Sequence, residues 1–208
     1  MRKSLHEARR ERILNAAAQT FTEFGYERAK VEAIAYDAGV STATVYNYFK
    51  TKPAIFAAMV ERVLAPFEGL FDSVETAHEP VEAGLMAYAR AYWGFMADPK
   101  VRAIYRTVSA EVRREPHLGT TLYTAAHRLL GSVLRRILEG YQADGVLDFD
   151  DVAIASRLLQ GMIEHPTLTI PLLQGDDAPA LHDRDAYCRE AVRAFLCAYR
   201  APAKPSEI

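Results

Sequence analysis

The stretch from Ala35 to Phe49 constrains the fold of this 208-residue chain more than any other. It places small and apolar residues where two short helices and a tight turn need them. Ala35 allows a close helix crossing, Gly39 accepts the positive φ that so short a reversal favours, and Ser41 can cap the second helix. The apolar contacts that fix the angle between the helices come from Ile34, Val40 and Val45. This spacing is typical of a helix-turn-helix, which makes DNA the first partner to consider; the alternative is an ordinary helical hairpin.

The flanking segments favour a DNA-binding unit over a hairpin. Behind the motif, Thr51 can cap a further helix, and Pro53 is tolerated in its first turn. Ahead of it, Gly25 sits where a helix needs a left-handed cap. The apolar stripe of that preceding helix, at spacings of three and four, consists of Ile13, Leu14, Ala17, Phe21 and Phe24.

The segment from about Arg10 to Val60 resembles the DNA-binding domain of the TetR family of transcriptional regulators. The resemblance rests on features that occur in order and at the family's spacing: Gly25-Tyr26, Ile34-Ala35, Ala38 to Ser41, Tyr46 to Phe49, and Lys52. It implies an all-α fold of about nine helices. An N-terminal three-helix helix-turn-helix DNA-binding domain is joined to a larger helical domain for effector binding and dimerisation. The stretch from Ile104 to Pro116 also resembles the sensor domain of a subgroup that regulates efflux and stress genes, which supports the fold but indicates no ligand.

Two departures from the family's pattern concern the second helix. The family usually has Ser or Thr where this chain has Ala29 and Lys30. The hydroxyl cap is therefore lost, and Lys30 can replace the phosphate contact by charge but cannot accept N–H bonds. Tyr36 stands where the family often has a small or charged residue, and we expect its ring to face either solvent or the sugar-phosphate backbone.

We expect the third helix, about Ser41 to Tyr48, to enter the major groove, because that groove admits a helix and distinguishes every base pair. Asn47 can pair with adenine, and the methyl groups of Ala43 or Thr44 can meet thymine. The base-edge candidates are Thr42, Ala43, Thr44 and Asn47. The resemblance implies phosphate contacts for Tyr46, Tyr48 and Lys52, with burial as the alternative for Tyr48. The predicted DNA-binding set is Lys30, Tyr36, Ser41, Thr42, Ala43, Thr44, Tyr46, Asn47, Tyr48 and Lys52.

The distribution of charge agrees with a basic N-terminal DNA-binding segment, residues 1–52, called the head below, and an acidic remainder. Nine basic and six acidic residues give residues 1–52 a net charge of +3, which leaves −5 for the rest of a chain of net charge −2. A difference of this size also arises by chance. The N-terminal arm either adds minor-groove or backbone charge or is freely solvated; its basic residues are Arg2, Lys3, Arg9, Arg10 and Arg12.

Several other functions find no support in the residue pattern. No apolar run reaches the roughly 20 residues that cross a bilayer, and no signal core opens the chain, which predicts a cytoplasmic protein without a membrane partner. The six histidines are scattered, so we expect no metal site and no cofactor. Cys188 and Cys197 fall on opposite faces of one helix and cannot bridge each other there. Plain thiols are the preferred interpretation, with redox sensing as the alternative.

The rest of the chain shows helical periodicity throughout. We expect a fourth helix ended or kinked by Pro66, a fifth from near Pro80, and a sixth after Asp98-Pro99 that ends before Pro116. A long seventh helix is predicted through Leu129 to about Tyr141. The eighth is capped by Asp148 and stops near His165-Pro166, and the last runs from about Asp183 to Tyr199. The predicted domains are 1–52 for DNA binding, 53–200 for effector binding and dimerisation, and 201–208 as a disordered tail.

The last two long helices fit a four-helix bundle between two copies, with packing inside a monomer as the alternative. Close approach there depends on the small residues Ala155, Gly161, Ala191 and Ala194. A small, largely apolar ligand held among helices five to seven can move the fourth helix and weaken operator binding. The ligand-site candidates are Tyr88, Tyr92, Trp93, Met96, Tyr105, Ser109, Tyr123 and His127, with plain packing as the alternative for each.

The sequence therefore predicts a dimeric repressor released from a palindromic operator by a small molecule. The first alternative is a DNA-binding activator or constitutive repressor without a ligand. The alternative of another class, an all-helical enzyme, lacks a phosphate loop, a nucleophile elbow or metal-ligand spacing.

Overall fold

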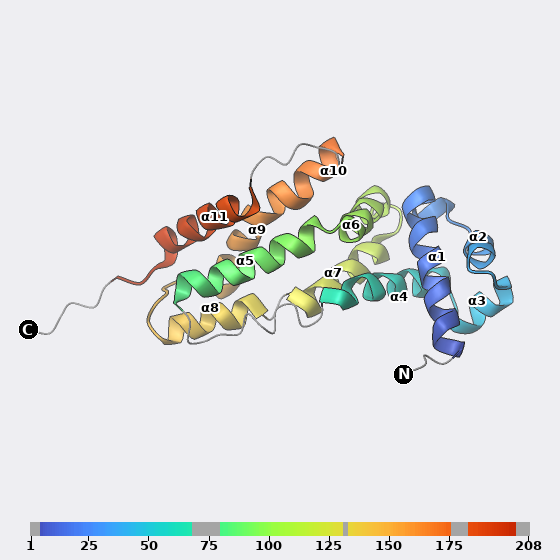
Figure 1. The fold of residues 1–208 in the computed structure, drawn as a ribbon, viewed down its shortest axis with the longest axis horizontal. Coiled ribbons are helices and arrows are strands. Elements are labelled where there is room, and N and C mark those ends of the chain that lie inside the picture. Colours follow the sequence, from blue (N-terminus) through green and yellow to red (C-terminus); the bar gives the residue numbers. More distant parts are fainter. Residues whose placement is uncertain (1–4, 68–79, 131–132, 176–182, 203–208) are drawn as a thin grey trace, which may run out of the picture. The chain divides into compact units, whose positions relative to one another are not determined.

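The protein is all-α in the computed structural model, which describes residues 5–67, 80–130, 133–175 and 183–202 (Figure 1). Within these ranges there is no β-strand, and one isolated bridge pairs Leu147 with Arg200. The all-α expectation is confirmed. The predicted tail lies outside the described residues from position 203 onward.

The helices of the head form where the sequence predicted them. Their bounds are α1 (Leu5–Arg28), α2 (Val31–Asp37), α3 (Thr42–Tyr48) and α4 (Lys52–Leu64), the last continued by a 3₁₀ turn (Ala65–Phe67). The backbone of α1 is kinked at Gly25, whose φ of +75° and ψ of 168° are not helical. Gly39, at φ +64°, turns the chain between α2 and α3.

The later helices are α5 (Val81–Ala97), α6 (Pro99–Glu111), α7 (Pro116–Leu130), α8 (Val133–Ala143), α9 (Val152–Glu164), α10 (Ile170–Gln174) and α11 (Arg184–Tyr199). The predicted fifth, sixth and last helices are confirmed as α5, α6 and α11. The predicted seventh helix, through Leu129 to about Tyr141, falls on the end of α7 and on α8, with positions 131 and 132 outside the described residues. The helical stretch of α7 that starts at Pro116 was not predicted. Polar and small residues dominate that segment, yet it buries a stripe formed by Leu118, Leu122, Ala125 and Ala126.

Of the predictions about the two ends of α9, the one about its start is corrected. Its N-cap is Asp151 and not Asp148: the Asp151 carboxylate accepts from the backbone N–H groups of Ala153 and Ile154 at 2.7 and 3.2 Å. The α-helix α9 ends at Glu164, beside the predicted stop at His165-Pro166, but helical structure does not end there. It continues through a π-helical turn (His165–Thr169) into α10, because the wider turn accommodates Pro166.

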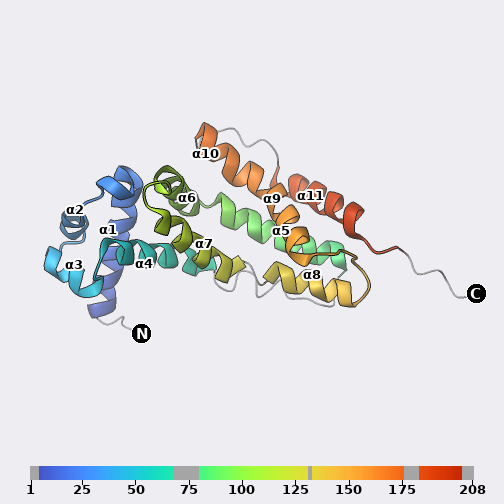
Figure 2. The ribbon, with the colours of Figure 1, turned by 180° about the vertical axis from the view of Figure 1, so that it is seen from behind.

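The chain forms two compact units, each made of two separate stretches. The first joins Met1–Pro66 with Lys100–His127, and so contains the whole predicted head together with most of α6 and α7. The second joins Phe67–Pro99 with Arg128–Ile208. In the second unit α11 packs on α5 and α9, and α8 packs on α9 (Figure 2).

Each unit has its own apolar core. In the first, Ile13, Leu14, Phe21, Ile34, Val45 and Phe56 are at most 1% exposed. In the second, Leu85, Tyr88, Phe95, Leu159, Ile163 and Phe195 are at most 2% exposed. Each such side chain contributes about 1.5–3 kcal/mol by leaving water, so the three-helix head has a core of its own that can hold α3 in place.

Candidate nucleic-acid interface

The recognition helix α3 is held by a hydroxyl cap and a buried valine. Ser41 Oγ accepts from the backbone N–H of Thr44 at 3.2 Å, and the two hydroxyls lie 2.8 Å apart. Val45 is fully buried and points into the head. The Thr44 hydroxyl is therefore engaged with the cap of its own helix, and the contact of its methyl group with thymine stays a prediction.

The outward face of α3 carries Ala43, Tyr46 and Asn47, all exposed, with Thr42 half-buried beside them. Asn47 makes no side-chain hydrogen bond to any residue that the structure describes, so its amide keeps both donors and its acceptor for a base edge. The predicted base-edge candidates, Thr42, Ala43, Thr44 and Asn47, lie together on one short helix, and Tyr46, a predicted phosphate contact, lies beside them.

Helix α2 adds two exposed side chains to this head. Lys30 occupies its N-cap and makes no side-chain capping bond, as the departure from the family's pattern predicted. Tyr36 is 85% exposed, and Tyr46 on α3 is 42% exposed. A hydroxyl on an exposed ring and a free ammonium are groups that contact phosphates without reading sequence.

Two of the predicted phosphate contacts are engaged within the protein. The Tyr48 hydroxyl donates to the backbone carbonyl of His6 at 3.2 Å, and the two rings lie 4.5 Å apart. Lys52 Nζ donates to the carbonyl of Glu27 at 3.0 Å and lies 4.6 Å from the Tyr26 ring centre. Burial lowers the pKa of Lys52, against the opposing effect of three nearby carboxylates. Whether either residue reaches a phosphate stays a prediction.

The basic arm is partly tied to the head. The Arg10 guanidinium lies 5.5 Å from the ring centre of Phe49, just after α3, whereas Arg12 is exposed. Arg62 on α4 pairs with Glu11 at 2.7 Å, which fixes the start of α1 against α4. Arg2 and Lys3 lie outside the described residues.

The predicted ligand-site residues divide between the two units. Tyr88, Tyr92 and Met96 are buried in the second unit, and Trp93 packs on Tyr187 at 5.6 Å between ring centres. In the first unit Tyr105 is half-buried, while Ser109, Tyr123 and His127 are exposed. Tyr123 is 66% exposed and contacts the His127 ring.

The buried tyrosines of α5 face polar side chains of α9. Gln160 Nε2 donates to Tyr88 Oη at 2.9 Å, and the Tyr92 hydroxyl donates to the Glu164 carboxylate. Burial raises the pKa of Tyr88 far above its ordinary value, so the phenol stays protonated. This row of hydroxyl, amide and carboxylate groups is a polar strip inside an otherwise apolar unit.

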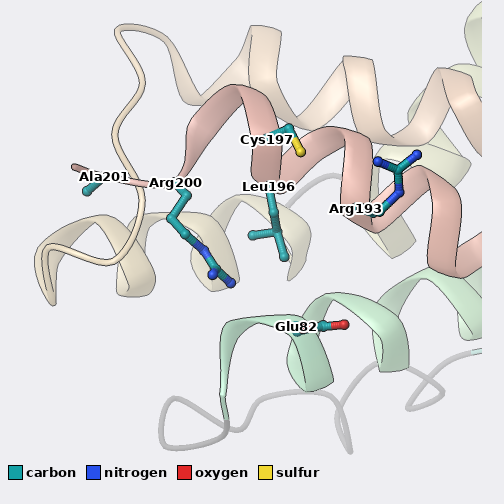
Figure 3. A pocket seen from close by; sticks show the side chains of 6 residues that line it. All are labelled: Glu82, Arg193, Leu196, Cys197, Arg200 and Ala201. Atoms are coloured by element: carbon teal, nitrogen blue, oxygen red, sulfur yellow. The ribbon is translucent and has the colours of Figure 1, made fainter. Parts of the chain in front are cut away.

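A separate pocket of about 440 Å³ opens between α11 and the start of α5. Its lining is Glu82, Arg193, Leu196, Cys197, Arg200 and Ala201, and Figure 3 shows Leu196 pointing from α11 toward the helix that carries Glu82. None of the eight predicted ligand-site residues lines this pocket.

The described part of the chain holds no cluster of His, Cys, Asp and Glu side chains that could bind a metal ion. None of its helices combines the length and apolar character that a membrane span requires.

A capped recognition helix with an exposed, hydrogen-bonding face on a small three-helix head defines a helix-turn-helix DNA-binding protein. Comparison with known proteins shows the family to which the chain belongs. Residues 13–59 match the model of bacterial regulatory proteins of the TetR family, and residues 83–201 match that of the AefR-like transcriptional repressor C-terminal domain. The chain belongs to the TetR family. It is a DNA-binding transcriptional regulator and not an enzyme.

Individual relatives agree with this assignment. The regulator UidR of Escherichia coli is 28% identical over 191 residues, which covers 90% of each chain. A TetR-family regulator from Mesorhizobium loti superposes with a TM-score of 0.81 at 23% identity, covering 96% of this chain and all of that one. The flavonoid-responsive regulator FrrA superposes with a TM-score of 0.70 at 26% identity, covering 94% and 98%.

Proposed function

We propose that this regulator is a cytoplasmic repressor that binds a palindromic operator as a homodimer and is released by a small, largely apolar ligand. The observation that carries the proposal is the exposed face of α3, where Ala43, Tyr46 and Asn47 stand free of the protein's own core. Base-edge reading by Asn47 and backbone contacts by Lys30, Tyr36 and Tyr46 account for these side chains together.

Replacement of Asn47 by alanine tests the reading of bases. Asn47→Ala is expected to relax the preference at one base pair of each half-site, at a cost of about 1–3 kcal/mol for the preferred base. Lys30→Ala is the matched comparison, because loss of a phosphate contact weakens all sequences alike and lowers the salt slope by about 1. Binding of a set of single-base variants of a selected duplex gives both results. If Asn47→Ala weakens every sequence equally, it does not read a base.

The second unit supports the dimer through an exposed apolar face. On α9, Ile154 is 54% and Leu158 is 51% exposed, and Gly161 beside them is exposed too. Ala194 and Ala198 are exposed on α11, which packs against α9. Large apolar side chains on α9, with small alanines on the adjacent α11, indicate a surface that a second copy covers, since two such helix pairs form a four-helix bundle. Two of the predicted contact residues, Ala155 and Ala191, are instead buried inside the protomer.

A charge at this face tests the dimer. Leu158→Glu is expected to give a monomer, because the dimer would bury an unpaired carboxylate. Leu173→Glu is the matched control, since Leu173 on α10 is 80% exposed and lies outside the face. Size-exclusion chromatography with light scattering distinguishes the two. A monomeric native protein, or a Leu158→Glu dimer, contradicts the proposed interface.

For the ligand, the polar strip of α5 and α9 offers hydrogen bonds within an apolar unit, which is the usual composition of a small-molecule site. The relative FrrA is named as flavonoid-responsive, which is in keeping with control by a small molecule. A thermal-shift screen with flavonoids and other apolar compounds tests this. Absence of any shift, with DNA binding intact, favours a regulator that works without such a ligand.

A further inference from the structure

The turn between α6 and α7 lies against the head inside the first unit, and its contacts converge on Tyr26. This side chain, just after the break in α1, is 4% exposed. Its ring lies 5.5 Å from each of three other rings: Phe21 on α1, Phe56 on α4 and His117 on α7. One aromatic ring therefore joins the end of α1, the helix after the recognition helix, and the start of α7.

The contact with α7 is polar as well as aromatic. His117 Nε2 lies 3.3 Å from the Tyr26 hydroxyl, and His117 Nδ1 lies 3.3 Å from a Glu115 carboxylate oxygen. The nearby carboxylate favours the proton on Nδ1, and in that tautomer of a neutral His117 the Nε2 lone pair accepts from the Tyr26 hydroxyl. Glu115 thus orients the ring that holds Tyr26.

Lys52 links the same ring to the recognition helix. It is the first residue of α4, four positions after α3 ends at Tyr48. Its ammonium lies above the Tyr26 ring and donates to the carbonyl of Glu27. A cation held over an aromatic face and bonded to a backbone carbonyl ties the start of α4 to the end of α1.

Two further contacts lie next to Tyr26, Lys52 and His117. Arg114 pairs with Glu27 at 3.2 Å, but both side chains are more than half exposed, so the pair contributes little. Glu111 Oε1 lies 3.3 Å from the place where a Cβ on Gly25 would be. The Glu111 carboxylate at the end of α6 therefore lies close to Gly25, and a Cβ there would require this side chain to shift by a few tenths of an ångström.

We propose that Tyr26, Lys52 and His117 form a clamp that fixes the orientation of α3 relative to the α6–α7 turn. They act as positioning residues for operator binding, and His117 is the member that lies outside the head. The consequence for affinity rests on the proposed dimer, because two recognition helices reach two half-sites only when each head is held at a defined angle.

The first experiment measures the affinity of the full chain for two duplexes from a random-DNA selection, one with two half-sites and one with a single half-site. Loss of a hydrogen bond of about 1 kcal/mol predicts that His117→Ala weakens binding to the double site roughly five- to tenfold. Binding to the single site is expected to stay unchanged, since α3 itself is intact. A general loss of folded protein would weaken both.

One further test variant and one control variant accompany His117→Ala. Tyr26→Phe keeps the ring under Lys52 but removes the hydroxyl, and is expected to act in the same direction as His117→Ala. Arg113→Ala is the control, because Arg113 is exposed on the same turn and makes none of these contacts. Equal weakening of both duplexes by His117→Ala, or no weakening of either, overturns the clamp.

A second experiment tests the clamp without relying on the proposed dimer. Spin labels at Lys50→Cys and Thr120→Cys, both exposed, report the distance between the head and α7 in a chain whose native cysteines are replaced by serine. The clamp predicts a narrow distance distribution that His117→Ala broadens. An unchanged distribution overturns it. If the native protein gains nothing from a second half-site, the dimer proposal fails while this measurement still stands.

Discussion

At the scale of single residues, the two cysteines differ in everything that governs thiol chemistry. Cys188 is buried, and burial raises its pKa to about 11, whereas Cys197 is exposed. The reactive species is the thiolate, so Cys188 is protected from modification both by its lack of exposure and by its raised pKa. We expect iodoacetamide at pH 8 to modify Cys197 and leave Cys188 unmodified until the protein unfolds, as read by peptide mass spectrometry. Modification of Cys188 at an equal rate in the native protein contradicts this burial.

Glycine at position 39 is required by its backbone conformation and not by space. Its φ is +64°, yet an added Cβ would meet only Arg12 Nη1, at 3.8 Å. Gly39→Ala is therefore expected to lower the free energy of unfolding by about 1–2 kcal/mol through strain alone. Gly94→Ala is the matched comparison. Gly94 is exposed within α5 with open space around it, and alanine there should add about 0.5–1 kcal/mol. Denaturant titration measures both, and equal effects would contradict the conformational argument.

At the scale of elements, α2 lacks the hydroxyl cap that α3 and α4 possess. The hydroxyls of Ser41 and Thr51 each accept a backbone N–H at 3.2 Å, whereas the Lys30 side chain accepts none. Lys30→Ser should therefore raise the free energy of unfolding by about 0.5–1 kcal/mol. The same change should weaken DNA binding and lower its salt dependence, because it removes a charge. A Lys30→Ser protein that is no more stable would show that α2 is already satisfied at its start.

The contact between α5 and α8 depends on a missing side chain. A Cβ on Gly84 would overlap the Tyr141 hydroxyl. Gly84→Ala is expected to cost about 1–3 kcal/mol of stability by overpacking. With Tyr141→Phe in the same chain the hydroxyl is gone, and the combined cost should fall below the sum of the two single costs. Additive losses in a double-mutant cycle would place the strain elsewhere.

Sequence reasoning succeeded for elements with local signals and failed where the signal was non-local. Gly25 and Gly39 have positive φ as expected, and α11 begins at Arg184, beside the predicted start at Asp183. The first part of α7 was missed because its threonines and Gly119 hide a short apolar stripe. Asp148 and Asp151 both suit an N-cap, and the sequence gives no reason to prefer the second.

The position of the candidate interface could be predicted from the sequence, but the contacts of several of its residues could not. The periodicity and the turn residues placed α3, and so the base-edge candidates on it. That Tyr48 and Lys52 bond to backbone carbonyls of His6 and Glu27 could not be foreseen, because those contacts join positions 42 and 25 residues apart. The clamp by His117 is missed for the same reason, since no local pattern links it to Tyr26.

At the scale of the whole molecule, the compact units do not follow the order of the chain. The first takes in Lys100–His127 along with the head, so the turn that holds Tyr26 belongs to the DNA-binding end. The second contains α9 and α11, which carry the proposed dimer face. Tyr88, Tyr92 and Met96 belong to the same unit as the proposed dimer face, whereas α3 belongs to the other unit.

The measurement that tests this account most directly is selection of the purified, ligand-free protein against random duplex DNA. A dimer that reads DNA with two copies of α3 predicts an enriched palindrome, with half-site centres one helical turn of about 34–36 Å, or a multiple of it, apart. Enrichment of a single half-site, or of no sequence at all, would contradict a ligand-free dimeric repressor.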